Sequence, residues 1–257
     1  MDASNKIIGS FCSELYTVKS FEPHFKIYEK YIKLLGYDGA CYTFLPKIQV
    51  ANIPLVNPVF KRTKHFPQAF LDNYEKQQFH HHDFTIRKGK ENCSYIPMDW
   101  RDNELNGDLS DEEKKLIIFA RDNHGITNAF TIPTQISDAI LAGATVISSL
   151  PDHDFKQLKI ETLNTLDIIT KLFHDKCSSS LSLVSIFSKP LLNKLNPTEM
   201  AVLRCLVDGI PTKQLADYVE ISHTSAKNVI CNLCNKLGGI NRDQLFFLIG
   251  RVNILQS

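Results

Sequence analysis

Residues 195–245 read LNPTEMAVLRCLVDGIPTKQLADYVEISHTSAKNVICNLCNKLGGINRDQL and hold the strongest local signals in the chain. Asn196 is a favourable N-cap, Pro197 suits the first helical position, and Glu199, three residues after the cap, can bond back to it. A helix is therefore expected to begin here, to bury an apolar stripe and to end at Gly209.

Three more helices are expected downstream. The second covers about residues 212–219, and Ser222 then caps a third helix that runs to Leu237. Asn241 caps a fourth, whose apolar face is formed by Leu245, Leu248, Ile249 and Val252. Two helices joined by a tight turn form the helix-turn-helix plan, in which the second of the pair can enter the major groove of DNA. The sequence predicts a C-terminal four-helix domain of this kind.

The third of these helices carries polar side chains on the side expected to be exposed: His223, Thr224, Lys227, Asn228, Asn232 and Lys236. A lysine can bind a phosphate or a guanine, an asparagine can pair with adenine, and the start of a helix favours a phosphate. Each residue alone is also compatible with an ordinary solvated surface. Their joint spacing makes double-stranded DNA the expected partner.

The stretch resembles the DNA-binding domain of the LuxR family of transcriptional regulators. The matching positions are Leu195, Pro197, Glu199, Val202, Leu203, Gly209, Lys213, Leu215, Ala216, Ile221, Ser222, Lys227, Asn228, Asn232, Lys236, Leu237, Gly238, Asn241, Arg242 and Gln244. The resemblance implies a DNA-binding transcriptional regulator and adds Lys213, Ser222 and Arg242 to the candidate DNA-binding residues. It also implies a homodimer on an inverted repeat, with half-sites about one helical turn apart, and RNA polymerase as a further partner.

Four positions depart from the family pattern. Pro211 stands where a serine cap is usual. Glu220 stands where the turn usually has glycine, so a positive φ with its steric penalty is expected there. Val229 and Ile230 replace residues that are usually polar. From residue 195 to the end, six Lys and Arg stand against five Asp and Glu, which predicts modest DNA affinity for a monomer and reliance on dimerisation.

Upstream, the chain alternates between helical and strand patterns. The expected elements are helices at 21–35, 66–80, 110–124 and from Asp152 onward, and strands at 39–45, 130–136 and 141–149. Helices before, between and after the strands indicate a sheet that is covered on both faces. The predicted fold class is therefore α+β: an N-terminal α/β/α sandwich with an antiparallel sheet, followed by the helix-turn-helix domain.

A serine-rich stretch from Cys177 to Pro190 loses the helical periodicity and is typical of a linker. We therefore expect a sensor domain at 1–176, a linker at 177–190 and a DNA-binding domain at 191–257.

Composition sets the broad class of protein. The chain has 257 residues, of which 43% are hydrophobic and 22% charged, and its net charge is +1, so a globular protein with only local basic surface is expected. The longest apolar runs are too short to span a bilayer, and the first residues lack a signal-peptide pattern. Seven irregularly spaced cysteines favour reduced thiols. A cytoplasmic protein without a membrane partner is the expectation.

Residues 35–177 resemble the ligand-binding domain of the quorum-sensing branch of the LuxR family, which recognises N-acyl-homoserine lactones. The resemblance centres on residues 66–70, Asn73, Tyr74, Asp83, residues 97–100, 109–113 and 125–126, Thr131, Ile132, Pro133 and Thr145. It implies a sensor of a small-molecule autoinducer, with no other cofactor and no metal. By position, Asp83 would accept the amide N–H of the ligand. Tyr74 and Trp100 would line the pocket, and Thr145 would place a hydroxyl near the amide.

The departures in this domain concern the polar end of the pocket. Phe70 stands where the family has a tryptophan that donates to the lactone carbonyl, and Phe66 stands at a phenol donor position. Phe84 replaces a proline and Ala129 a glycine. An unpaired carbonyl costs about 1–3 kcal/mol, or about ten- to a hundredfold in affinity. Three hypotheses stay open: the domain binds an N-acyl-homoserine lactone, another small apolar ligand, or no ligand because the Phe side chains fill it.

Other patterns are weaker. Asp83 is also compatible with a structural carboxylate that caps local backbone. Residues 80–82 are three consecutive histidines, but neighbours on a helix point in different directions, so a solvated helix end is expected rather than a metal site. Cys231 and Cys234 have CxxC spacing without a second pair, so zinc is not expected.

No arrangement of residues indicates catalysis, so the chain is not expected to be an enzyme. The rival hypotheses are a metal hydrolase built on residues 80–83 and an anti-regulator. The anti-regulator would dimerise with a related factor without binding DNA. It is motivated by the weak basic charge and by Val229 and Ile230.

Overall fold

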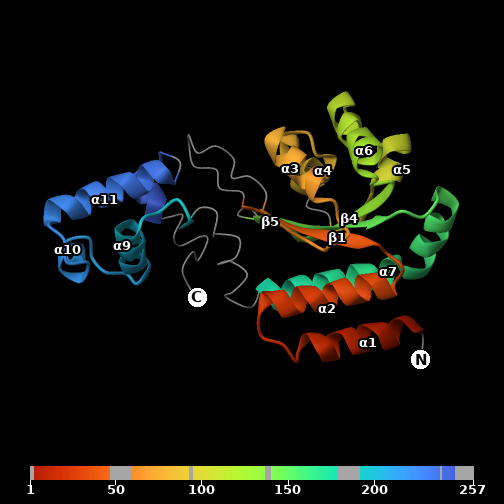
Figure 1. Ribbon diagram of the computed structural model, residues 1–257, viewed down its shortest axis with the longest axis horizontal. Coiled ribbons are helices and arrows are strands. Elements are labelled where there is room, and N and C mark those ends of the chain that lie inside the picture. Colours follow the sequence, from red (N-terminus) through yellow and green to blue (C-terminus); the bar gives the residue numbers. More distant parts are fainter. Residues whose placement is uncertain are drawn as a thin grey trace. The chain divides into compact units, whose positions relative to one another are not determined.

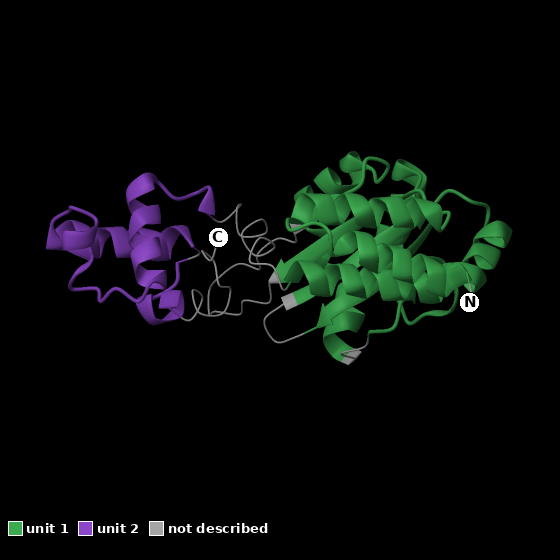
Figure 2. Cartoon of the chain, turned by 90° about the horizontal axis from the view of Figure 1, so that it is seen from below, with its two compact units in different colours: residues 1–46, 57–180 green, residues 47–56, 181–257 purple. Residues whose placement is uncertain are grey.

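The computed structural model describes residues 3–46, 59–92, 95–136, 140–178, 192–237 and 239–246. These residues form two compact units, one from the described residues up to 178 and the other from 192 onward (Figure 2). Most of the predicted linker, 179–190, lies outside the described residues. The domain limits therefore stay predictions, and each unit is treated separately below.

A five-stranded antiparallel sheet forms the centre of the N-terminal unit. Its strands are β1 (Gly39–Pro46), β2 (Val59–Arg62), β3 (Met98–Asp99), β4 (Asn128–Ile136) and β5 (Ile140–Ser148), in the order β2-β1-β5-β4-β3. The three predicted strands correspond to β1, β4 and β5. The short edge strands β2 and β3 were not predicted, because two to four residues give no measurable alternation.

Helices cover both faces of this sheet (Figure 1). One face carries α2 (Phe21–Leu34) and α7 (Asp152–Ser178), and α1 (Ala3–Leu15) packs against these two helices. The other carries α3 (Gln68–Lys76), α4 (Phe84–Asn92), α5 (Trp100–Asn106) and α6 (Asp111–His124). The predicted α/β/α sandwich is therefore confirmed, and α2, α6 and α7 begin where the sequence placed them.

Alternation along β1 assigns its side chains to the two layers. Tyr42 points toward α2 and α7, where its hydroxyl lies 2.6 Å from His174 Nδ1 and its ring packs edge-on against Phe173. Cys41 and Leu45 point to the other face, toward the cavity described below. One strand thus contributes to a sealed aromatic core on one side and to a site on the other.

Local capping rules explain α6. The Ser110 hydroxyl accepts from the Glu113 N–H, and the Glu113 carboxylate accepts from the Ser110 N–H, so both halves of a capping box are present. The helix ends at Gly125, whose φ of 67° favours glycine.

The single helix predicted over residues 66–80 is wrong in detail. The structure has α3, a break, and then a short 3₁₀ helix, Phe79–His81. The break lies at Gln78, whose φ of 52° no α-helix can accommodate. The sequence offers no glycine or proline at this point to mark it.

The C-terminal unit contains α9 (Pro197–Val207), α10 (Leu215–Tyr218) and α11 (His223–Lys236). Asn196 and Glu199 form the predicted capping box, with N–H to oxygen distances of 2.8 Å in both directions. The second helix is shorter than predicted, because residues 212–214 form turns.

Asn241 caps a further helix, as predicted: its side chain accepts from the Gln244 N–H at 2.8 Å, and residues 242–246 are helical. The predicted continuation of that helix, with Leu248, Ile249 and Val252, lies outside the described residues. The core of the unit is apolar and includes Val202, Leu203, Leu206, Leu215, Ala226, Ile230, Leu233 and Leu245.

Candidate ligand pocket and nucleic-acid interface

A cavity of about 80 Å³ lies between the sheet and the helices α3, α4 and α5 of the N-terminal unit. Its floor follows from the strand register. Cys41 of β1 stands opposite Thr145 of β5, Thr145 stands opposite Thr131 of β4, and Thr131 stands opposite Met98 of β3. All four residues line the cavity. Antiparallel pairing therefore places one row of side chains from four strands across the site.

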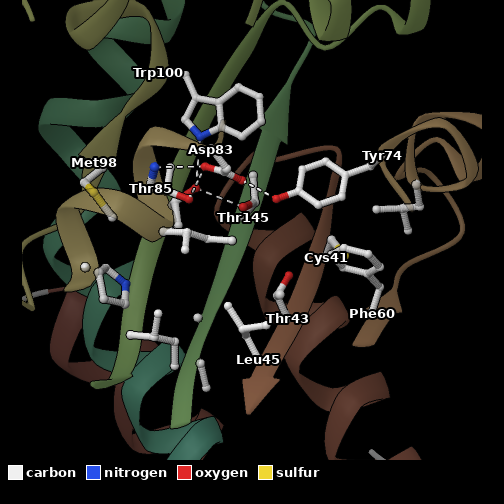
Figure 3. A pocket seen from close by; sticks show the side chains of 18 of the residues that line it. Cys41, Thr43, Leu45, Phe60, Tyr74, Asp83, Thr85, Met98, Trp100 and Thr145 are labelled. Atoms are coloured by element: carbon white, nitrogen blue, oxygen red, sulfur yellow. Dashed lines mark hydrogen bonds between the residues drawn. The ribbon is translucent and has the colours of Figure 1, made fainter. Parts of the chain in front are cut away.

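Asp83 is the most strongly hydrogen-bonded group of the site. Its Oδ1 accepts from the Thr85 N–H at 2.8 Å and from the Thr85 hydroxyl at 2.7 Å, and its Oδ2 accepts from the Tyr74 hydroxyl at 2.7 Å (Figure 3). The bond to the Thr85 N–H makes Asp83 the N-cap of α4. Both interpretations of this carboxylate therefore hold at once: it caps local backbone, and it lines the cavity.

The surroundings of Asp83 and Tyr74 shift the pKa values of both groups. Burial raises the pKa of Asp83, and the hydrogen bonds from Thr85 and Tyr74 act against that rise. Burial and the neighbouring carboxylate raise the pKa of Tyr74 well above that of a free phenol, so its hydroxyl keeps its proton and donates. A carboxylate has about four acceptor positions, and three are filled. The Ile86 N–H also acts on this carboxylate as a hydrogen-bond donor, so a ligand donor would share an acceptor position of Asp83 with these groups.

A second chain of hydrogen bonds crosses the cavity. The Trp100 indole N–H donates to Thr131 Oγ1 at 2.9 Å, and Thr131 Oγ1 lies 2.9 Å from Thr145 Oγ1. Trp100 therefore acts as a wall and fixes the threonine pair, while its own donor is already in use.

Phe66 and Phe70 close one end of the cavity. Both are buried, their ring centroids are 6.2 Å apart in an edge-to-face arrangement, and Phe70 lies 5.9 Å from the ring of Tyr74. Neither side chain has a polar hydrogen. Phe84 lies outside the lining of the cavity and packs edge-on against Trp100 at 6.3 Å.

All six residues predicted for ligand binding line this one cavity: Phe66, Phe70, Tyr74, Asp83, Trp100 and Thr145. Their contact with a ligand stays a prediction. Thr85, Cys41, Thr43 and Met98 also line the cavity and were not predicted. The spacing of Asp83 and Thr85 was an available signal, because an N-cap aspartate accepts from the residues that follow it.

The cavity is small for its assigned class of ligand, since pockets for organic ligands usually measure about 300–1,000 Å³. A ligand of that size would need lining side chains to move. Met98, which lines the edge-strand side, is the most adaptable of the lining residues because it is unbranched.

In the C-terminal unit, every residue predicted for DNA contact is exposed: Lys213, Ser222, His223, Thr224, Lys227, Asn228, Asn232, Lys236 and Arg242. Ser222 is the N-cap of α11 and accepts from the Ser225 N–H at 3.0 Å. Ala226, Ile230 and Leu233 form the opposite, buried face of the helix. The exposed side of α11 thus meets the first requirement for a groove-reading helix.

Lys236 has a structural partner that the sequence did not reveal. Its Nζ lies 2.7 Å from Oε2 of Glu199, whose side chain is only 2% exposed. Burial alone would raise the pKa of Glu199. The Lys236 ammonium and the Asn196 N–H together have a larger, opposite effect, so the pKa is lowered and the group stays ionised. Lys236 therefore links α11 to the N-terminal cap of α9. Arg242 also has a partner within the unit, because its guanidinium donates to the Thr212 hydroxyl at 3.2 Å.

Two departures from the family pattern are explained by the structure. Ile230 is buried and Val229 is half-buried against the same core, so neither replaces a groove-facing polar residue. Glu220 has a φ of 55°, which confirms the predicted left-handed backbone in the turn before α11.

The histidine run differs from the expectation of a solvated helix end. His80 is only 5% exposed, and burial lowers its pKa to about 4, whereas His81 and His82 are exposed. The described part of the chain contains no group of three residues suited to a metal ion. Cys231 is exposed and Cys234 buried, so the two thiols face different surroundings.

Two family profiles match the sequence. The profile of the autoinducer binding domain matches residues 20–177, and that of the bacterial regulatory proteins of the luxR family matches residues 193–249. The chain belongs to the LuxR family of autoinducer-binding regulators. Proteins of this family are transcription factors and not enzymes, and the paired domains make this chain a quorum-sensing type of transcription regulator.

Solved structures of LuxR-type regulators share this fold. SdiA of Escherichia coli is 16% identical, with 97% of this chain and 98% of that chain covered and a TM-score of 0.51. SdiA in complex with octanoyl-rac-glycerol is 17% identical, with 97% and 93% covered and a TM-score of 0.50. CepR2 of Burkholderia cenocepacia, an N-acylhomoserine lactone dependent factor, is 13% identical, with 70% and 98% covered and a TM-score of 0.52.

No curated protein sequence matches the chain significantly. Among the described residues, no helix combines the length and the apolar character needed to cross a membrane.

Proposed function

We propose that this LuxR-type regulator senses a small, largely apolar molecule in its N-terminal unit and binds operator DNA as a homodimer through α11. The carrying observation is the cavity around Asp83, whose carboxylate lines the cavity and is fixed by hydrogen bonds from Tyr74 and Thr85. An N-acyl-homoserine lactone or another small apolar compound is the ligand. The protein works in the cytoplasm and acts on transcription together with RNA polymerase.

The cavity fits an amide-bearing acyl compound in its general layout. Asp83 would accept from the amide N–H, and the threonine pair at Thr145 would donate to the amide carbonyl. Leu45 and Leu141 would contact the acyl chain. Figure 3 shows Asp83, Tyr74 and Thr145 pointing toward one another, with Leu45 on the far side from Trp100.

In the DNA complex, α11 would lie in the major groove. Lys227 and Lys213 would contact phosphates, and Asn228, Asn232 and Thr224 would face base edges. The unit carries little net positive charge, so two copies on an inverted repeat would be needed for useful affinity. A ligand that binds the dimer-competent state would shift the population toward that state.

A ligand-independent regulator is the second candidate. The observation that favours it is the small cavity volume, about 80 Å³, with Phe66 and Phe70 packed at one end. One of the two observations behind the anti-regulator hypothesis is weakened, because Ile230 is buried in the core and Val229 is half-buried against it.

Two experiments separate these candidates. An organic extract of the purified protein, examined by mass spectrometry, is expected to contain a compound that is absent from an extract of Asp83→Leu. Because a solved structure shows SdiA in complex with octanoyl-rac-glycerol, acylglycerols belong among the reference compounds.

A gel shift with random-sequence duplex, titrated with salt, is expected to show salt-dependent binding. Binding that is absent at low salt would favour the anti-regulator, and an empty extract from both proteins would favour the ligand-independent regulator.

A further inference from the structure

The side chains that line the cavity use most of their hydrogen-bond donors on one another. The Tyr74 and Thr85 hydroxyls both donate to Asp83, and the Trp100 indole donates to Thr131. None of these three donors is free for a ligand without breaking a bond at 2.7–2.9 Å.

The threonine pair has one hydroxyl hydrogen left. Thr131 and Thr145 carry two hydroxyl hydrogens between them, and one joins the two oxygens at 2.9 Å. Because Thr131 already accepts from Trp100, the pair can be oriented either way, and in both orientations one hydrogen stays unused between these side chains. This hydrogen can serve one acceptor atom of a ligand.

The other polar side chains of the lining, Cys41 and Thr43, interact with neighbouring protein groups. The Cys41 thiol contacts the Tyr42 carbonyl at 4.0 Å, and Thr43 lowers the pKa of that thiol. Burial raises the pKa of Cys41 to about 12, so the thiol stays neutral. Beyond these groups, Phe66 and Phe70 close one end without a polar hydrogen.

We infer that the ligand carries a single donor–acceptor pair, such as a secondary amide or a hydroxy-ketone, between two apolar ends, and that it lacks a lactone ring. Asp83 takes the donor and the Thr131–Thr145 pair serves the acceptor. A homoserine lactone brings a second carbonyl into the end formed by Phe66 and Phe70. The inference rests on the proposed sensing function, because it requires that the cavity take a ligand.

Two probes differ only in the oxygens of the lactone. N-octanoyl-homoserine lactone and N-cyclopentyloctanamide share the acyl chain, the amide and a five-membered ring. The second lacks both the carbonyl oxygen and the ring oxygen of the lactone. Trp100 lines the cavity and is the single tryptophan of the chain, so its fluorescence reports occupancy directly. The cyclopentyl amide is expected to bind the full-length protein about ten- to a hundredfold more tightly, because no carbonyl is left unpaired.

A third probe and two variants separate hydrogen bonding from general hydrophobicity. Cyclopentyl octanoate, an ester without the N–H, is expected to bind the wild type at least about tenfold more weakly than the amide, because Asp83 loses its donor. Phe66→Tyr adds a hydroxyl at the apolar end and is expected to narrow the preference for the cyclopentyl amide. The matched control Phe66→Leu adds no donor and is expected to keep it.

The outcomes distinguish this inference from the proposed function. A lactone that binds the wild type as tightly as the cyclopentyl amide, or an ester that binds as tightly as the amide, overturns the inference and leaves small-molecule sensing intact. If no probe changes the fluorescence of Trp100 up to its solubility limit, both the sensing function and the inference fail. The wild-type measurements decide the matter even if Phe66→Tyr does not fold.

Discussion

The two functional regions of this regulator are built in opposite ways. The pocket collects side chains from all five strands of the sheet and from three helices, and its polar groups are mostly buried and bonded to one another. The residues predicted to contact DNA lie mainly on one helix, α11, whose polar side chains are exposed. In the pocket, function and stability therefore depend on the same bonds. On the recognition helix they are separable, because the opposite face supplies the packing.

The two units nevertheless share one local device. Each has a helix that begins with a capping box whose glutamate is buried and paired with a cation from another helix. Glu113 of α6 accepts from Arg87 Nε at 2.7 Å, and Glu199 of α9 accepts from Lys236 Nζ at 2.7 Å. Each capping box joins two residues that are three positions apart in the sequence. The cation that pairs with each glutamate comes from a distant part of the sequence.

The largest effect is expected from Asp83→Ala. The change removes the N-cap of α4 and leaves the Tyr74 and Thr85 hydroxyls without their acceptor, so the free energy of unfolding of the N-terminal unit should fall by about 3 kcal/mol. Urea unfolding followed by Trp100 fluorescence measures this unit alone. Asp83→Asn, which keeps an acceptor, should lose clearly less. Wild-type stability in Asp83→Ala would break the link between pocket and fold.

Lys227→Ala tests the opposite property of the recognition helix. Operator affinity should fall by about tenfold, and the slope of log affinity against log salt should flatten by about one unit, because one phosphate contact is lost. Stability should not change, since Lys227 is exposed. Lys227→Arg is the matched control and should keep the slope. An unchanged slope and affinity in Lys227→Ala would remove this residue from the interface.

A pH series on Glu113→Gln tests the capping device. Burial alone would raise the pKa of Glu113. The hydrogen bonds from Arg87 and from the Ser110 N–H have a larger, opposite effect, so the pKa lies below the ordinary 4.5. A carboxyl group whose pKa is lower in the folded than in the unfolded protein stabilises the fold at any pH above its unfolded-state pKa. This stabilisation is lost as the pH falls through its folded-state pKa.

The unfolding free energy of the wild type should therefore exceed that of Glu113→Gln by about 1 kcal/mol at pH 7 and converge with it toward pH 3. Trp100 fluorescence in urea is again the readout. A constant difference across this range would assign the effect to packing instead of charge.

The smallest effect is expected at Gln78 in the pocket unit and Glu220 in the turn before α11, the non-glycine residues with left-handed backbone among those that the structure describes. Glycine removes the steric penalty but gains freedom in the unfolded chain, so each substitution should stabilise its own unit by about 0.5 kcal/mol. Hydrogen exchange of α3 and α11 amides, measured by mass spectrometry, reports each unit separately. Destabilisation in Glu220→Gly would mean that its side chain makes a compensating contact.

Features set by nearby residues could be predicted from the sequence, whereas features set by tertiary contacts could not. The caps Asn196, Ser222 and Ser110 were predicted correctly because capping depends on residues three apart. The pairings of Thr131 with Thr145, and of Lys236 with Glu199, depend on strand register and helix packing, which no local pattern encodes. The break at Gln78 and the burial of His80 were missed for the same reason: tertiary contacts override local preference there.

The most direct test of the account measures the affinity of the full-length protein for duplexes selected from a random-sequence library, with and without the compound recovered from its own organic extract. The account predicts that the compound raises the affinity of the wild type and leaves that of Asp83→Asn nearly unchanged. Equal affinities with and without the compound in the wild type would contradict it.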